Sequence, residues 1–161
     1  MQILVSVISP PITAEFEANS DPGPGHRFVF SEDLTLERYE GLKPGKGLPK
    51  KKKRRLAGTH SGFVTTMRIA GPNDRLFPPD CFLFQYEATY SFKTVPNTPL
   101  EHGDVTAFGL MVGFLLNGDF HPLEPPNILA ITGGTKAYRL ARGQIIDGVP
   151  RPENRLLDIE L

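Results

Sequence analysis

The sequence predicts an all-β fold, and three observations lead to that expectation. Glycine and proline, 16 residues each among 161, recur at short intervals and so favour many short elements joined by turns. β-branched and aromatic residues dominate the segments between these turns, and no segment keeps a sustained helical period. Even spacing of short strands and turns is typical of a β-barrel or a β-sandwich. At this length we expect a single domain, residues 1–161, with a sizeable core.

The expected strands follow one another along the whole chain. They are residues 2–8, 12–16, 27–30, 34–39, 58–69, 82–93, 104–116, 128–132, 137–146 and 155–161. Clusters such as Ser9-Pro10-Pro11, Gly71-Pro72-Asn73-Asp74, Asn117-Gly118-Asp119 and Pro150-Arg151-Pro152 form the turns between them, and Ser31-Glu32-Asp33 can begin one short helical turn. Strands 58–69 and 82–93 are about twice the usual length, and long tilted strands favour a closed barrel, which has no exposed edges.

The composition is that of an ordinary soluble protein, with 39% hydrophobic and 22% charged residues. The single cysteine, Cys81, excludes an internal disulfide. No apolar run approaches the roughly 20 residues of a membrane span. The N-terminal segment 1–8 lacks the basic start of a signal peptide and is better interpreted as a first strand. We therefore expect a cytoplasmic protein that does not associate with membranes.

The net charge of zero hides a strong asymmetry. Eight of the 18 basic residues lie between Lys43 and Arg55, where no acidic residue occurs, so the rest of the chain carries a net charge of −8. We expect 43–55 to be a flexible basic loop, because like charges repel one another and keep such a segment extended. The run 49–55 also matches a nuclear-import signal, and the loop could instead bind anions or close over a barrel mouth. The acidic remainder repels phosphates, which argues against nucleic acid as a partner.

Segment 130–145, AITGGTKAYRLARGQI, places the glycine pair Gly133-Gly134 between two apolar stretches and predicts a sharp reversal. This segment resembles the signature corner of the allene oxide cyclase and dirigent-protein barrels. Segments 58–69 (GTHSGFVTTMRI) and 86–92 (YEATYSF) resemble two successive strands of allene oxide cyclases. The likeness covers about 100 residues, 55–144, and is loose over the first 50. It implies a closed antiparallel eight-stranded barrel with a central ligand cavity, assembled as a homodimer or homotrimer.

The resemblance also implies which side chains face the barrel interior. On the three central strands these are Tyr86, Ala88, Tyr90 and Phe92; His60, Gly62, Val64, Thr66 and Arg68; and Val105, Ala107, Gly109, Met111 and Gly113. Small residues between Met and aromatic residues leave room for an apolar small molecule, although the same side chains could simply fill a small core. The expected substrate-binding residues are Val64, Thr66, Ala88, Phe92, Ala107, Gly109 and Met111.

Segment 12–18 (ITAEFEA) resembles the first hairpin of allene oxide cyclases, which carries a carboxylate, and the match implies Glu15 for that role. A buried carboxylate beside an apolar substrate stabilises developing positive charge or acts as a general base. Glu17 shares the strand face of Glu15 and is a rival, and both could be solvated on an edge strand. Tyr86 and Tyr90 would add electrostatic stabilisation.

The side chain of His60 is expected to face the barrel interior. It can act as acid, base or hydrogen-bond donor near neutral pH, or can be a hydrogen-bonded core residue. Arg139 matches an arginine of the dirigent corner, which implies a pocket residue that orients a carbonyl or carboxylate; as a strand residue it could equally be solvated. We expect no metal and no nucleotide cofactor. The other histidines and Cys81 lack ligand spacing, and no Gly-rich loop opens a helix.

These features predict a cofactor-independent cyclase that closes a ring in an apolar polyunsaturated or carbonyl-bearing metabolite, in secondary metabolism. Its expected catalytic residues are Glu15, His60, Tyr86, Tyr90 and Arg139. Val64 stands where the family has a cysteine and Met111 where it has a tyrosine, so the resemblance implies a fold and a cyclisation role but not a substrate. One alternative is a dirigent-like or lipocalin-like barrel that binds a ligand without turnover. Another is a hydrolase or dehydratase that uses His60 and a carboxylate.

Overall fold

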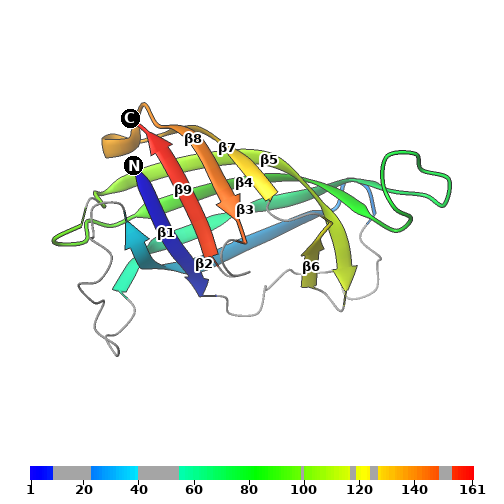
Figure 1. Ribbon diagram of the computed structural model, residues 1–161, viewed down its shortest axis with the longest axis horizontal. Helices are drawn as coiled ribbons and strands as arrows, with labels where there is room; N and C mark the ends of the chain where they lie inside the picture. The colour runs from blue at the N-terminus through cyan, green and yellow to red at the C-terminus, as the bar shows by residue number, and fades with distance from the viewer. Residues whose placement is uncertain (9–22, 40–54, 99, 117–118, 124–126, 149–153) are drawn as a thin grey trace.

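The computed structural model is a closed antiparallel β-barrel of eight strands, which confirms the predicted fold class (Figure 1). It describes residues 1–8, 23–39, 55–98, 100–116, 119–123, 127–148 and 154–161. The barrel strands are β1 (Gln2–Ile8), β2 (Arg27–Tyr39), β3 (Arg55–Ile69), β4 (Phe82–Phe92), β5 (Gly103–Leu116), β7 (Asn127–Gly134), β8 (Arg142–Asp147) and β9 (Asn154–Glu160). Each pairs with the next, β9 pairs with β1, and the short strand β6 (Asp119–Pro122) pairs only with β5.

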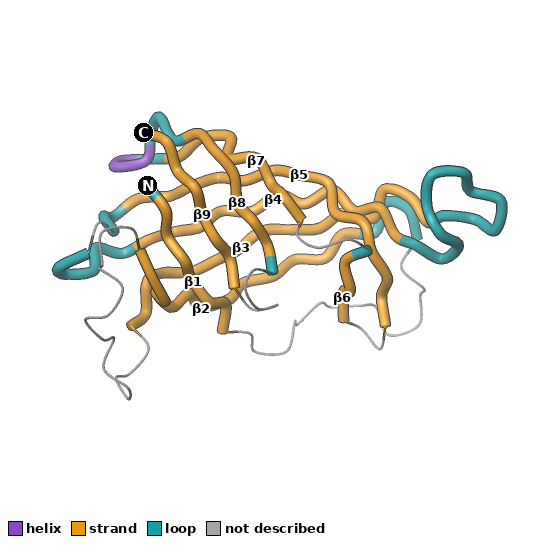
Figure 2. Tube along the Cα trace, in the orientation of Figure 1, coloured by secondary structure: helices purple, strands orange, loops and turns teal. Residues whose placement is uncertain are grey.

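The strands differ in length, and this gives the barrel two unlike ends. Strands β2 to β5 have 13, 15, 11 and 14 residues, whereas the other barrel strands have six to eight. The long strands therefore continue past the point where β1 and β8 end and β9 begins, and the loop 70–81 lies at their tip (Figure 2). We call this end of the barrel, beyond Ile8, Asp147 and Asn154, the extended end.

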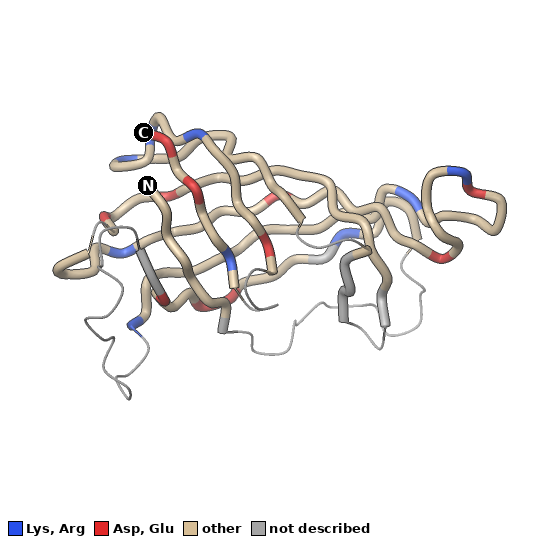
Figure 3. The backbone as a smooth tube through the Cα atoms, viewed as in Figure 1, with Lys and Arg blue, Asp and Glu red and all other residues tan. Residues whose placement is uncertain are grey.

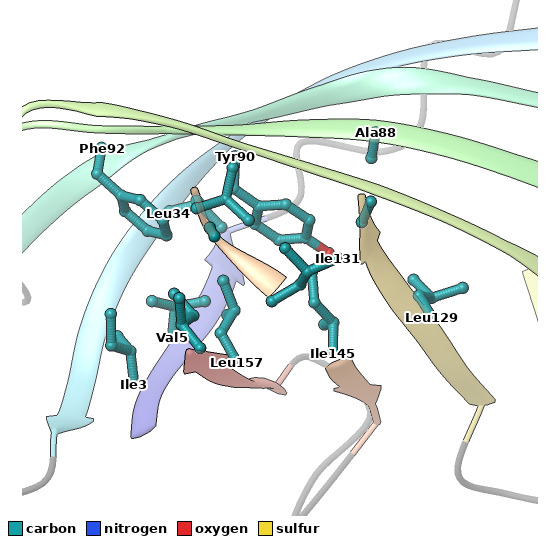
Figure 4. Packing of buried hydrophobic residues seen from close by; sticks show 14 of the residues in the cluster. Ile3, Val5, Leu34, Ala88, Tyr90, Phe92, Leu129, Ile131, Ile145 and Leu157 are labelled. Carbon is teal, nitrogen blue, oxygen red and sulfur yellow. The ribbon is translucent and has the colours of Figure 1, made fainter. Parts of the chain in front are cut away.

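Alternating apolar side chains fill the barrel interior. Every second residue of β4 from Phe84 to Phe92 is buried, as the predicted phase requires. Ile3, Val5, Leu34 and Leu157 from three other strands meet them and are fully buried (Figure 4). Burying a side chain of this size stabilises the fold by about 1.5–3 kcal/mol. This shared core holds the strands, and the functional groups on them, in register.

Close strand contact at Gly143 shows why one residue of β8 must be glycine. Its φ of +125° lies in the region that side chains rarely adopt, and an added Cβ would lie 2.0 Å from the carbonyl oxygen of Asp158. Glycine there lets β8 approach β9 at the point where β8 begins.

Three elements differ from the expectation. Residues 27–30 and 34–39 belong to one strand, β2, because β1 and β3 pair with it through Asp33, so no helical turn forms. Residues 137–146 are not one strand. The 3-10 helix η1 (Lys136–Tyr138) turns the buried Tyr138 ring onto Phe92, and β8 begins only at Arg142. Strand β6 forms directly after an expected turn.

The expected strand 12–16 and the basic loop 43–55, except Arg55, lie outside the described residues. In the described part of the chain, no helix is long and apolar enough to cross a membrane.

Candidate active site at the extended end

A chain of hydrogen bonds joins three neighbouring strands inside the barrel. The Nδ1 atom of His60 on β3 lies 3.0 Å from the Oε2 atom of Glu32 on β2. On its other side, the Nε2 atom of His60 is hydrogen-bonded to the hydroxyl of Tyr86 on β4. His60 is only 2% exposed and is shielded from water, whereas the Glu32 side chain keeps 10% exposure. Carboxylate, imidazole and phenol in this order form a path along which a proton can move.

Strand register explains why these side chains meet. Glu32 pairs with His60, and His60 pairs with Tyr90, so three functional groups lie in one row across the sheet. Tyr86 lies in another row, and the pair Gly62 and Ala88 separates this row from that of His60 and Tyr90. Gly62 has no side chain and Ala88 has only a methyl group, so neither blocks the contact between Tyr86 and His60. The alternation of large polar and very small residues therefore creates the contact.

The partners of His60 determine its tautomer. An ionised Glu32 carboxylate can only accept, so Nδ1 carries the proton, and a neutral imidazole then accepts the Tyr86 O–H at Nε2. Burial lowers the pKa of His60 below its ordinary 6.5, although the hydrogen bond to Glu32 opposes this shift. Burial also raises the pKa of Tyr86 well above 10.0. At neutral pH both groups are uncharged, and the proton of Tyr86 points at a basic nitrogen.

A second polar pair lies at the adjoining ends of β8 and β9, where an acidic and a basic residue are side by side (Figure 3). The Nε atom of Arg155 lies 2.5 Å from Oδ1 of Asp147, and an N–H of Arg155 donates to the Asn154 carbonyl at 3.0 Å. Burial raises the pKa of Asp147, whereas the nearby Arg155 opposes that rise. Burial alone would lower the pKa of Arg155. The neighbouring Asp147 carboxylate raises it, and the net shift is upward. The pair acts electrostatically on His60, Tyr86 and Tyr90, and thus belongs to the same cluster.

Tyr90 completes the cluster and differs from Tyr86 in its bonding. Its ring stacks on His60 with 4.4 Å between ring centroids, and the residue is 0% exposed. Burial raises its pKa to about 12. The two tyrosine hydroxyls are close enough for each to shift the pKa of the other. Nevertheless, the Tyr90 hydroxyl has no partner with hydrogen-bond geometry among the described residues.

Apolar rings surround these polar groups toward the extended end. Phe30 is half-buried and stacks on Tyr86 at 5.5 Å, and it also lies 4.7 Å from the His60 ring. Beside them are the half-buried Val64 and the buried Met111. Water reaches the cluster at its charged side chains. The exposed fraction is 10% for Glu32, 14% for Asp147 and 17% for Arg155. The arrangement offers an apolar surface next to groups that can donate, accept and transfer protons.

A separate depression of about 390 Å³ lies on the outer wall of the barrel. Outward-facing Phe63 and Phe108 line it together with Glu87 and several threonines. Glu87 accepts a hydrogen bond from Gln85 at 2.7 Å, and no member of the Glu32–His60–Tyr86 chain reaches this depression. The depression and the buried hydrogen-bonded chain are therefore separate features, and the central ligand cavity remains a prediction.

The structure brings three of the five expected catalytic residues together: His60, Tyr86 and Tyr90. Glu15 and its rival Glu17 lie outside the described residues. Arg139 is exposed in the turn after η1 and is not on an inward-facing strand, because the chain leaves the barrel wall there so that Tyr138 can enter the core. The expected strand position of Arg139 is therefore wrong, whereas its role at a pocket remains a prediction.

The expected substrate-binding residues divide by position. Thr66, Ala88, Ala107 and Met111 are buried, and Val64 and Gly109 are half-buried. Phe92 packs against Tyr138 at the opposite end of the barrel, 5.6 Å between ring centroids, away from the polar cluster. Leu129 occupies the space beside Gly109, where an added Cβ would lie 2.6 Å from its side chain. Their roles in binding remain predictions.

Sequence reasoning missed Glu32, Asp147 and Arg155. A signal for each was present, because each shares the inward phase of its strand with buried apolar residues two positions away. Glu32 follows this alternation with Leu34, Asp147 with Ile145, and Arg155 with Leu157. A charged residue on the apolar face of a strand is costly unless it is paired, and therefore marks a candidate site.

Comparisons with known proteins support the fold. No protein-family model matches the chain, and no curated protein matches it in sequence. Among solved structures, a pyocyanin demethylase superimposes with a TM-score of 0.60 at 19% identity, over 99% of this chain and 100% of the other. The pterocarpan synthase dirigent protein GePTS1 superimposes with a TM-score of 0.51 at 17% identity, over 99% of this chain and 80% of the other. The chain thus has the barrel fold of the dirigent and allene oxide cyclase type.

Proposed function

We propose that this protein is a cofactor-independent enzyme that closes a ring in an apolar, carbonyl-bearing small molecule by proton transfer at the extended end of the barrel. The observation that carries the proposal is the buried chain from Glu32 through His60 to Tyr86. Such a chain lets a neutral tyrosine act as a base without first becoming a free phenolate, because His60 takes its proton as the substrate delivers another.

The proposed reaction conserves all atoms of the substrate. An acidic O–H or C–H of the substrate gives its proton to the Tyr86 oxygen while the Tyr86 proton moves to Nε2 of His60. The freed electron pair forms the new ring bond, and the electrons of the attacked double bond move onto the conjugated carbonyl oxygen. The negative Glu32 stabilises the imidazolium of His60 until the proton returns along the same path to the substrate carbon. Substrate and product are therefore isomers.

The aromatic surroundings favour this reaction because they restrict the substrate. Phe30 and Tyr86 stack, and Phe82 stacks on Phe84 at 5.5 Å, so flat surfaces lie next to the proton path. Holding two reacting groups together in the correct orientation removes several kcal/mol from a barrier. Two solved structures with a similar fold are named as a demethylase of pyocyanin and as a pterocarpan synthase dirigent protein, which agrees with a barrel that binds or transforms small molecules.

A ligand-binding barrel without turnover is the second candidate, and the half-buried apolar rings favour it. A binder would show affinity but no conversion. A hydrolase or dehydratase that uses His60 and Glu32 would change the mass of its substrate, whereas a cyclase would not.

The test begins in the organism that carries the gene. Its metabolites are compared by mass spectrometry with those of a strain that lacks the gene, and purified protein is then added to the extract. We expect a less cyclised compound to accumulate and to be converted into an isomer by the wild-type protein but not by a His60→Gln variant. An unchanged metabolite profile, or a compound that the protein only binds, would refute the proposal.

A further inference from the structure

We infer that the Tyr90 hydroxyl is a substrate-binding group that donates a hydrogen bond to a carbonyl oxygen, so that the substrate class is a ketone, enone or quinone. The inference rests on the proposed function, because it places this oxygen beside the Glu32–His60–Tyr86 chain. It goes further by assigning one atom of the substrate to one atom of the protein.

The first reason is the unsatisfied hydroxyl of Tyr90. Buried hydroxyl groups almost always have a hydrogen-bond partner, since a buried group without one loses its hydration and gains nothing in return. Tyr90 is 0% exposed, and its hydroxyl lies near that of Tyr86 but makes no contact with hydrogen-bond geometry in the described part of the chain. The other fully buried tyrosine outside the cluster, Tyr138, accepts a bond from the backbone N–H of Glu101 at 3.3 Å. Tyr90 thus holds a polar atom in the interior whose hydrogen-bonding capacity the described residues leave unused, and a ligand can satisfy it.

The second reason is that Tyr90 is held rigidly in place. It pairs with His60 across β3 and β4, and the two rings stack. Leu34, Ile131 and Leu157 converge with its ring in the barrel interior (Figure 4). A donor fixed in this way gives direction to a hydrogen bond and loses little freedom when a ligand binds.

The third reason concerns the charge around the hydroxyl, which favours a neutral oxygen over an anion. With a pKa of about 12, Tyr90 remains protonated and therefore donates. The charged groups that act on it are Arg155, which has the largest effect of the three, and the carboxylates of Asp147 and Glu32. The charge of Arg155 is already offset by its ion pair with Asp147, so the site suits a neutral carbonyl oxygen, which accepts the bond without bringing a full charge.

The fourth reason is the position of Tyr90 next to Tyr86. Their neighbouring hydroxyls place a donor beside a proton acceptor, which is the arrangement that a conjugated carbonyl requires. When the substrate proton moves to Tyr86, negative charge develops on the carbonyl oxygen at Tyr90. Arg155, held by Asp147, then stabilises that charge across the site.

Two small probes test the assignment by binding alone. Benzylideneacetone carries a conjugated ketone, and phenylbutene has the same carbon skeleton without the oxygen. We expect the wild-type protein to bind the ketone about tenfold more tightly than the hydrocarbon. Tyr90→Phe should abolish this preference, while Tyr138→Phe, the matched control at the other end of the barrel, should keep it. The infrared carbonyl stretch of the bound ketone should also lie at lower frequency in the wild type than in Tyr90→Phe.

Three results would each overturn the inference. They are equal affinities for the two probes in the wild type, an unchanged preference for the ketone in Tyr90→Phe, and no binding of either probe. Failure of the proposed function has a different signature. If carbonyl preference depends on Tyr90 but no compound is ever converted, the subsite stands and the cyclase does not. If conversion occurs and Tyr90→Phe affects neither affinity nor rate, the cyclase stands and this subsite does not.

Discussion

Removing single hydroxyl groups from Tyr86 and Tyr90 should have different effects on stability, although both residues are buried tyrosines on β4. Tyr86→Phe deletes the donor to Nε2 of His60 and leaves that nitrogen buried without a partner. An orphaned buried acceptor of this kind lowers the free energy of unfolding by about 1–3 kcal/mol. Tyr90→Phe deletes a hydroxyl that makes no contact of hydrogen-bond geometry among the described residues, so the free energy of unfolding should stay the same or rise by up to about 1 kcal/mol.

Thermal unfolding followed by circular dichroism resolves this difference. For a chain of 161 residues, 1 kcal/mol corresponds to about 2–4 °C in Tm, so Tyr86→Phe should unfold about 2–12 °C below wild type. Tyr90→Phe should unfold at or slightly above the wild-type temperature. A loss in Tyr90→Phe as large as that in Tyr86→Phe would show that the Tyr90 hydroxyl is bonded in the free protein, and would refute the reasoning.

Four further predictions concern single positions. Since burial lowers the folded-state pKa of His60, the unfolded chain takes up this proton first, and the free energy of unfolding should fall as pH decreases below about 6.5; denaturant titrations of His60→Gln should lack this slope. Arg155→Met leaves its partner carboxylate buried and should reduce the free energy of unfolding by about 3–5 kcal/mol, measured by urea unfolding. Gly143→Ala should cost about 1–3 kcal/mol, while Gly71→Ala, which has open space around it, should be neutral in the same thermal assay. Arg139→Ala should change stability by less than about 0.5 kcal/mol and should leave ketone binding unaltered, because the residue is exposed and remote from the cluster.

The sequence predicted the barrel well where local pattern determines the structure. The alternation from Phe84 to Phe92 follows directly from apolar residues at every second position, and the structure has the same phase. The segment around Glu32 could not be assigned in this way, because three consecutive polar residues have the pattern of a turn. Only pairing with β1 and β3, which is a long-range property, keeps them in a strand.

The candidate site was predictable in part for the same reason. His60, Tyr86 and Tyr90 lie on strands whose phase the sequence reveals, so their common orientation could be expected. Asp147 and Arg155 are far from them in the sequence, and their contact depends on how β8 and β9 close the barrel. Arg139 shows the opposite failure, because a matching motif does not fix the path of the chain when a buried ring such as Tyr138 redirects it.

The rate at which purified protein converts the accumulated metabolite tests the central claim most directly. The wild type, Tyr86→Phe and the surface control Arg139→Ala are compared, and the mass of the product is recorded. We predict a product with the mass of the substrate, a rate in Tyr86→Phe at least about 100-fold below wild type, and an unchanged rate in the control. A product of different mass, or a Tyr86→Phe variant that converts the compound as fast as the wild type, would contradict proton transfer through the Glu32–His60–Tyr86 chain.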